Sequence, residues 1–155
     1  MPEFILERQI TLPAPLDRVF PFFARAANLE RLTPPFLRFE IRTPEVEMGE
    51  GALLDYRIRL HGFPMRWRSR ITVWEPPHRF VDEQTQGPYR TWIHEHRFRE
   101  QDGQTEVHDR VRYAVPGGTL VHRLFVEPDL RKIFDYRHQV LREVFPGEAT
   151  PSPGR

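Results

Sequence analysis

The feature of this sequence that most restricts its fold is a change of period near residue 116. From residue 54 to residue 115, apolar and polar side chains alternate in short segments separated by turn-forming Gly, Pro and Asp residues. Such alternation predicts half-buried strands, and strands that follow one another in this way pair as antiparallel hairpins. From residue 119 to residue 145, apolar residues recur at three- and four-residue spacings, which predicts a helix. Pro128 lies inside it and predicts a kink or a break.

The N-terminal part of the chain adds one strand and two short helices. The helices are expected to start near Asp17 and Ala26, and Thr33-Pro34-Pro35 ends the second, because residues before proline leave the helical region. Together with the alternating segments, this predicts strands over residues 3–12, 36–42, 54–61, 65–73, 79–85, 90–99 and 105–115.

We therefore expect an α+β fold in which a curved antiparallel sheet of about seven strands surrounds a long C-terminal helix. The sheet must cover its apolar face, and only the terminal helix is long enough to do so. A bent sheet that closes on one helix leaves a space between them, which is the expected ligand pocket. Residues 1–146 are expected to form a single domain. Residues 147–155, rich in Pro, Gly and Ser, are expected to be a disordered tail.

Composition narrows the functional classes. Hydrophobic residues make up 39% and charged residues 29%, as in ordinary globular proteins, and no apolar run approaches the ~20 residues of a membrane span. The N-terminus lacks the pattern of a secretory signal, so we expect a cytoplasmic protein. The absence of cysteine excludes disulfides, thiolate catalysis and zinc–thiolate sites. A net charge of +1 argues against wholesale nucleic-acid binding.

Several short segments resemble a known family. They are Leu32-Thr33-Pro34-Pro35, Phe80-Val81-Asp82-Glu83-Gln84, Gly87-Pro88-Tyr89, Trp92-Ile93-His94-Glu95-His96-Arg97-Phe98, Asp109-Arg110-Val111, Phe125-Val126-Glu127-Pro128-Asp129-Leu130 and Phe134-Asp135-Tyr136-Arg137. Over about residues 3–146 the chain resembles the helix-grip (Bet v 1-like) fold of the SRPBCC or START-like superfamily. Within it, the chain looks like the bacterial ligand-binding group near the polyketide cyclase/dehydrase proteins. The resemblance implies the fold and leaves the activity open, because this superfamily contains carriers, receptors and enzymes.

The most informative segment is the strand that holds His94 and His96. On a strand, alternate side chains share a face, so both histidines point the same way as Trp92 and Phe98. A hairpin near residues 101–103 sets His96 roughly opposite Asp109 of the next strand. In the preceding strand, Asp82 and Gln84 share a face, and Asp82 is placed to approach His94. Arg8 of the first strand completes the polar groups that we expect to project into the aromatic-walled cavity.

Three interpretations of these polar groups stay open. They form a buried hydrogen-bonded network, they orient the polar head of a ligand, or His94, His96 and a carboxylate hold a metal ion. A lone His-x-His pair is a weak metal signal, so we predict no metal and no cofactor. The residues expected to contact a ligand are Tyr56, Trp67, Asp82, Gln84, Trp92, His94, His96, Asp109, Tyr113 and Phe134.

The pair of His96 and Asp109 is also a candidate for acid/base catalysis. Asp109 would fix the tautomer of His96, leaving the other ring nitrogen to move a proton. Since His–Asp pairs are also common structural links, no catalytic residue is assigned. Nucleophilic catalysis is disfavoured because Ser69 has no histidine at a suitable spacing and Ser152 lies in the tail.

The opposite face of the sheet is rich in arginine. The residues are Arg57, Arg59, Arg66, Arg68, Arg70, Arg97, Arg99, Arg110 and Arg112. Either they pair across strands with Glu3, Glu7, Glu83 and Glu95, or they bind an anionic partner such as ribosomal RNA or a lipid surface.

Our prediction from sequence is a monomeric or homodimeric protein that binds, and by binding transports or senses, a small hydrophobic or aromatic molecule. A non-catalytic role is favoured over the first alternative, a polyketide cyclase/dehydrase-like enzyme that uses a His–Asp pair. The second alternative is an RNA- or ribosome-associated protein that uses the arginine-rich face.

Overall fold

The computed structural model of the chain describes residues 2–43 and 46–147. Most of the expected tail, residues 148–155, lies outside the described residues. The strands are β1 (Phe4–Leu12), β2 (Glu40–Ile41), β3 (Leu53–Leu60), β4 (Phe63–Glu75), β5 (Arg79–Gln86), β6 (Thr91–Gln101) and β7 (Gln104–Ala114). The helices are α1 (Leu16–Phe23), α2 (Ala27–Leu32), the 3₁₀ turn η1 (Pro35–Leu37), α3 (Gly118–Val121), the π-helical turn η2 (His122–Val126) and α4 (Glu127–Val144).

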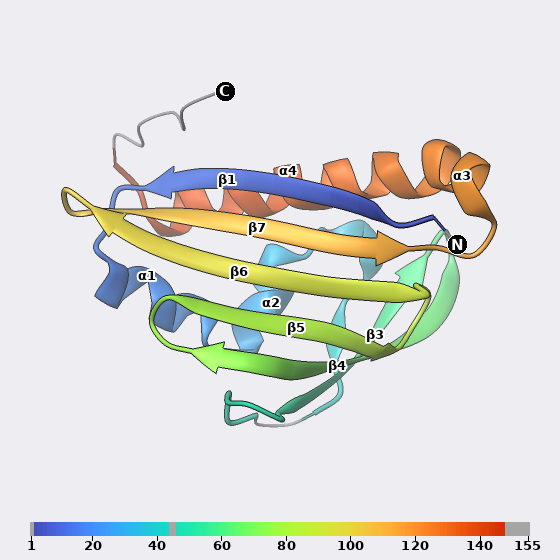
Figure 1. Cartoon of the computed structure of the whole chain (residues 1–155), viewed down its shortest axis with the longest axis horizontal. Coiled ribbons are helices and arrows are strands. Elements are labelled where there is room, and N and C mark those ends of the chain that lie inside the picture. Colours follow the sequence, from blue (N-terminus) through green and yellow to red (C-terminus); the bar gives the residue numbers. More distant parts are fainter. Residues whose placement is uncertain (1, 44–45, 148–155) are drawn as a thin grey trace.

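All strands pair in one antiparallel sheet of order β1-β7-β6-β5-β4-β3-β2. The first strand therefore lies beside the last one, and β2 to β7 follow as consecutive neighbours. Figure 1 shows the sheet with α1, α2 and α4 on one side of it, α4 running alongside β1. The predicted α+β helix-grip architecture, with its curved sheet and long C-terminal helix, is confirmed.

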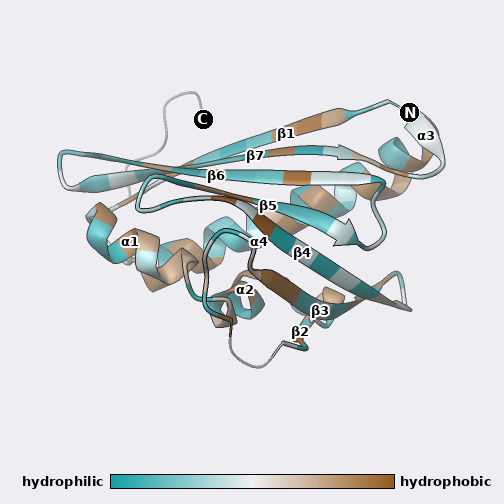
Figure 2. Ribbon diagram, turned by 60° about the horizontal axis from the view of Figure 1, so that its bottom comes forward, coloured by the Kyte–Doolittle hydropathy of each residue, from teal (hydrophilic) through white to brown (hydrophobic). Residues whose placement is uncertain are grey.

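Alternation sets which side of each strand faces the helices. The residue-by-residue hydropathy in Figure 2 changes along the strands, because successive side chains point to opposite faces. In β6, the buried residues are Trp92, His94, His96 and Phe98, as predicted. The same holds in β7 for Val107, Asp109, Val111 and Tyr113.

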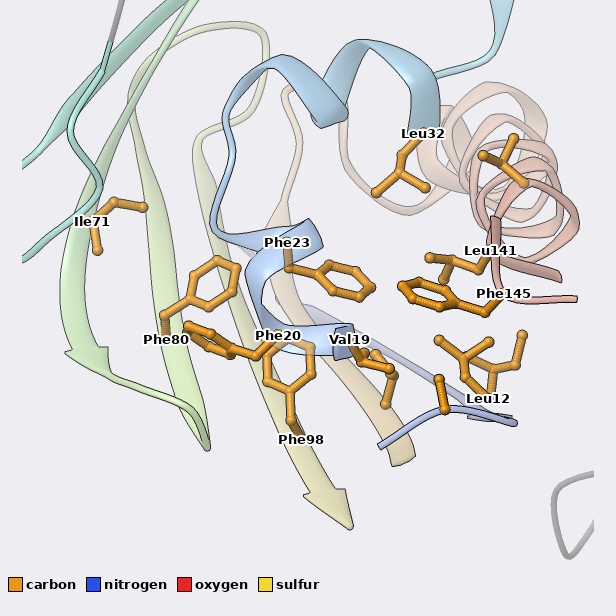
Figure 3. Packing of buried hydrophobic residues seen from close by; sticks show 14 of the residues in the cluster. Leu12, Val19, Phe20, Phe23, Leu32, Ile71, Phe80, Phe98, Leu141 and Phe145 are labelled. Carbon is orange, nitrogen blue, oxygen red and sulfur yellow. The ribbon is translucent and has the colours of Figure 1, made fainter. Parts of the chain in front are cut away.

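An aromatic core fixes α1 against the sheet. Phe20 of α1 packs edge-on against Phe98 of β6, with ring centroids 5.2 Å apart, and Phe23 contacts the same ring at 5.0 Å. Figure 3 shows Phe23 next to Leu141 of α4 and to Phe145, which directly follows this helix. This cluster anchors both helices against the inner face of the sheet.

Two strands differ from the prediction for local reasons. The expected strand over 36–42 is reduced to the two residues of β2, because Pro34 and Pro35 lead into η1 and Arg38 has a positive φ of 46°. In β4, the register to β5 shifts between Ile71 and Val73. After this bulge Trp74 packs on Phe80, with centroids 5.5 Å apart, where simple alternation predicts Val73 inside.

The C-terminal helix changes geometry before Pro128, as the sequence predicted. Pro128 sits in the first turn of α4 and has no N–H to donate to the preceding turn. The chain adopts the π-helical turn η2 there, between α3 and α4. The break is thus a local widening of the helix, and α4 itself runs uninterrupted beneath the sheet.

Candidate functional site

A cavity lies between the inner face of the sheet, α2 and α4. The volume open to the centre of a water molecule is about 150 Å³, roughly ten times what a single buried water needs. Most of its wall is aromatic or aliphatic. The polar residues in the wall are Arg25, Asn28, Thr33, Asp82, His94, His96 and Arg137. Such a space suits a small apolar molecule with one polar end.

Four aromatic side chains from β3, β4, β6 and the β5–β6 connection form one continuous wall. The ring of Trp67 lies 6.0 Å from Tyr56, 5.5 Å from Tyr89 and 5.3 Å from Trp92. Buried Ser69 accepts a hydrogen bond from Trp67 Nε1 at 2.9 Å and shares another with the Tyr56 hydroxyl at 3.0 Å. Ser69 thus orients the wall and does not face a histidine base. Burial raises the pKa of Tyr56 and of Tyr89, so both phenols stay neutral.

The predicted polar cluster forms, but its pairs are exchanged. In the strand register His96 lies opposite Asp109 and His94 opposite Asp82, as predicted. The short hydrogen bonds run diagonally. His94 Nε2 donates to Asp109 Oδ1 at 2.8 Å, and His96 Nε2 donates to Asp82 Oδ2 at 2.6 Å. The two directly opposite pairs are longer, at 3.5 Å for His96 with Asp109 and 3.9 Å for His94 with Asp82.

Arg137 of α4 supplies the cationic group of the cluster. Its Nη2 lies 3.5 Å from Asp109 Oδ1 and 3.5 Å from His96 Nδ1, and the residue is buried. Arg8, predicted from the sequence to be the arginine of this cluster, instead donates to Asp135 of α4 at 2.6 Å. The sequence does contain a signal that Arg137 is buried and paired. It falls on the same helical stripe as Leu130, Phe134 and Leu141, where an arginine is out of place unless paired.

The charges of the cluster follow from these contacts. Burial alone would raise the pKa of Asp109, but the Arg137 guanidinium and the hydrogen bond from His94 hold it well below its usual range. The pKa of Asp82 is lowered in the same way. Burial alone would raise it, but the hydrogen bond from His96 outweighs the effect of burial. Burial, with His94 adding to it, lowers the pKa of His96 to about 4, so this imidazole is neutral at pH 7.

The ten residues predicted as ligand contacts separate into two groups. Those in the cavity wall are Tyr56, Trp67, Asp82, Trp92, His94 and His96. The other four lie behind it. Asp109 supports His94, Phe134 packs against the His94 ring at 5.7 Å, and Tyr113 shares a hydrogen bond of 2.7 Å with His122. Gln84 holds the β5–β6 connection, donating to the Tyr89 carbonyl at 2.7 Å and accepting from its N–H at 3.1 Å.

The arginines of the outer face are partly paired, as one of the two interpretations expected. Cross-strand ion pairs join Arg110 to Glu7 at 3.1 Å, Arg112 to Glu3 at 3.8 Å and Arg79 to Glu95 at 2.6 Å. Over residues 2–43 and 46–147, four arginines of β3 and β4 have no carboxylate within 4.0 Å. They are Arg57, Arg59, Arg66 and Arg70. Arg57 even lies directly opposite Arg66 in the strand register.

Within the part of the chain that the structure describes, no helix has the length and apolar character to cross a membrane.

Solved structures with the same fold include proteins of different kinds. TTHA0849 from Thermus thermophilus is 21% identical, with 92% of this chain and 95% of that chain covered and a TM-score of 0.69. The Zhui aromatase/cyclase from Streptomyces sp. R1128 is 18% identical, with 96% and 100% covered and a TM-score of 0.72. Norcoclaurine synthase from Thalictrum flavum is 14% identical, with 95% and 96% covered and a TM-score of 0.67. At these identities the likeness shows the fold alone.

Sequence comparison gives the family. A search of curated proteins finds no match. The family described as polyketide cyclase / dehydrase and lipid transport matches residues 12–139, which include β3 to β7 and most of α4. The match thus spans the cavity wall and the whole polar cluster. The chain belongs to the polyketide cyclase / dehydrase and lipid transport family.

Proposed function

We propose that this protein binds a small, largely apolar molecule with an aromatic part in the cavity, and carries or senses it in the cytoplasm. The observation that supports this most is the cavity wall. Its aromatic and aliphatic side chains come from the sheet and the helices, while Asp82, His94, His96 and Arg137 form one hydrogen-bonded polar group in it. Such a wall favours apolar ligands through burial, and a few polar groups select their orientation.

The polar end of the ligand is expected to meet Asp82 and His96. Both line the cavity, and their hydrogen bond leaves Asp82 with further acceptor capacity toward it. Asp109, in contrast, is 1% exposed and lies behind His94, to which it is most closely bonded. A ligand that carries a hydroxyl or an amine at one end of an aromatic ring system therefore fits better than a plain hydrocarbon, since it can donate to Asp82.

The decisive experiment is native mass spectrometry of the protein as purified from cells, with the released small molecule identified after denaturation. A ligand of defined mass at one per chain is expected. In parallel, a panel of hydroxylated and unsubstituted aromatic compounds can be compared by how strongly each quenches the fluorescence of Trp67 and Trp92. The order of their affinities would show which polar group the site prefers.

Two matched variants on β3 test whether the ligand binds in the cavity. Leu60 lines the cavity, whereas Leu53 lies outside it on the same strand. Leu60→Trp should fill part of the space and weaken binding at least tenfold, and Leu53→Trp should leave it unchanged. Equal effects of the two variants, or a wild-type protein that binds no member of the panel, would contradict the proposal.

A second candidate is acid/base catalysis on the bound molecule. It is favoured by the neutral His96 imidazole, which faces the cavity and is held in one orientation by Asp82. The orienting carboxylate is Asp82, where the sequence predicted Asp109. His96→Gln and Asp82→Asn would then abolish product formation even at ligand concentrations that saturate each variant, as followed by mass spectrometry of the incubated ligand. Recovery of the ligand unchanged from wild-type protein leaves binding as the function.

A further inference from the structure

We propose that Asp82, His94 and His96 form a site for one divalent transition-metal ion, with Zn²⁺ as the best match, at the polar end of the cavity. This inference concerns the same cavity as the proposed function and shares Asp82 and His96 with its polar end, but it does not depend on the apolar wall. It also reverses the expectation from sequence, where a His-x-His pair alone was too weak a signal. The structure identifies the carboxylate ligand as Asp82 and adds a supporting group.

The ligand atoms converge. One ring nitrogen of each histidine and one carboxylate oxygen of Asp82 lie within 4.8 Å of one another. Two imidazoles and one carboxylate are a common zinc ligand set, in which a fourth position stays open for water or substrate. Here all three residues line the cavity, so that open position would face the bound molecule.

The tautomer of His94 leaves a lone pair where an ion is needed. Its Nε2 donates its proton to the carboxylate of Asp109 at 2.8 Å, so in the neutral ring Nδ1 is an acceptor. This Nδ1 faces Asp82 Oδ2 at 3.9 Å, and the carboxylate is an acceptor as well. Two electron-pair donors that face each other across this distance are stabilised by a cation between them.

Asp109 supplies the outer support that metal-binding histidines need. Ligating histidines typically donate their second ring N–H to a carboxylate, which fixes the ring and strengthens the ligand. Asp109 Oδ1 lies 2.8 Å from Nε2 of His94 and 3.5 Å from Nδ1 of His96, on the side of each ring away from Asp82. One buried carboxylate thus serves both histidines, and Arg137 at 3.5 Å balances its charge.

The rearrangement on binding is small. Zn²⁺ bonds of about 2.0–2.2 Å place tetrahedral ligand atoms roughly 3.3–3.5 Å apart. The existing distances to Asp82 Oδ2, 2.6 Å from His96 and 3.9 Å from His94, lie on either side of that value. Each of these two pairs has to change by less than about 1 Å, and the two histidine nitrogens start within 4.8 Å of each other. The Nε2 proton of His96 moves to Nδ1, where Asp109 Oδ1 at 3.5 Å accepts it in place of the Arg137 Nη2 contact.

The test uses the full chain without a histidine tag, stripped with a chelator and titrated with Zn²⁺ by calorimetry at pH 7. We expect one ion per chain with a dissociation constant of about 10 µM or tighter. Co²⁺ should give the visible absorption of a tetrahedral site. Absence of a one-to-one Zn²⁺ complex in the folded wild-type protein overturns the proposal, whatever the variants do.

Single substitutions of the proposed ligands test where the ion binds. His94→Gln and His96→Gln should each lose the one-to-one complex, whereas His108→Gln, on the outer face of β7, should retain it. Asp109→Asn should weaken affinity about 10–100-fold by releasing both rings. Loss of binding in His108→Gln, or its retention in both ligand variants, places the ion elsewhere and overturns the proposal. Titration of the stripped protein with the aromatic panel tests the proposed function separately, because the apolar wall does not depend on the ion.

Discussion

His94 donates a hydrogen bond of 2.8 Å to Asp109, the residue diagonal to it across the β6–β7 ladder. The right-handed twist of a sheet brings one set of diagonal side chains together, and residues two positions apart across a ladder remain within reach of long side chains. The register of the strands therefore does not by itself determine which histidine holds which carboxylate. That choice decides which ring nitrogens remain available to the cavity.

Double-mutant cycles can measure this pairing. We expect a coupling free energy of about 1–3 kcal/mol between His94→Gln and Asp109→Asn, because the cycle removes a buried hydrogen bond to a charged group. The cycle of His96→Gln with Asp109→Asn should give less than half of that, since the two groups are 3.5 Å apart. Urea unfolding gives both values, and a larger coupling for His96 would show that the directly opposite pair dominates in solution.

Removal of the Ser69 hydroxyl should loosen the aromatic wall. Ser69→Ala leaves the buried N–H of Trp67 and the hydroxyl of Tyr56 without their partner, which costs about 1–3 kcal/mol. Tyr56→Phe removes only one of the two bonds and should preserve the Trp67 geometry. Near-UV circular dichroism and thermal unfolding report both effects, and an unchanged aromatic spectrum in Ser69→Ala would refute this role.

Acid should destabilise the fold through His138, a buried residue of α4 outside the cavity wall. Burial lowers its pKa to about 4, and nearby Arg8, Arg137 and Arg142 act in the same direction while Asp109 opposes them. The unfolded chain binds the proton at a pKa of about 6.5, so stability is present above that pH and is lost as the pH falls toward 4. The loss is about 3 kcal/mol at most.

His138→Leu should flatten this part of the stability profile between pH 6.5 and pH 4. His78→Gln, in the exposed β4–β5 turn, is the control and should keep the wild-type slope. Chemical unfolding at a series of pH values provides the comparison. Buried His96, whose pKa is also lowered to about 4, acts over the same pH window, so part of the slope remains in His138→Leu. A slope as steep as that of the wild type would contradict the role of His138.

The facing arginines of β3 and β4 offer a stabilising substitution. Arg66→Glu converts the directly opposite like-charge pair with Arg57 into an opposite-charge pair, for a gain of about 0.5 kcal/mol. The gain should shrink in high salt because the site is exposed. Arg90→Glu, just before β6, has no facing arginine and should not stabilise. A fall in melting temperature for Arg66→Glu would show that the arginine pair is held by an unseen anion.

The faces of the strands were predictable because alternation is a local property. Burial of Trp92, His94 and Phe98 on one side of β6, and of Asp109 on β7, follows from a two-residue period alone. The hairpin also set the register, since Asp102 and Gly103 both have the positive φ of a tight two-residue turn. The choice between opposite and diagonal partners depends on sheet twist, which no local pattern records.

Contacts between α4 and the sheet were harder to predict. Arg8 and Arg137 both point toward the space between these elements, and only the docking of the helix decides that Arg8 pairs with Asp135 while Arg137 reaches Asp109. The bulge in β4 is a similar case. One extra residue near Val73 exchanges the inner and outer side chains beyond it, and Trp74 becomes the inward one.

The two residues of β2 cover only part of the outer edge of β3, pairing with Tyr56 and Arg57. Asp55 also bonds to Arg42 and Thr43, so among the described residues it is the edge backbone from Ile58 to Leu60 that a strand of another molecule could pair with. Arg57 and Arg59 stand on either side of Ile58 along this edge. Arg59 lies where β2 no longer covers β3, and a charged side chain at an uncovered sheet edge disfavours pairing with a strand of another molecule.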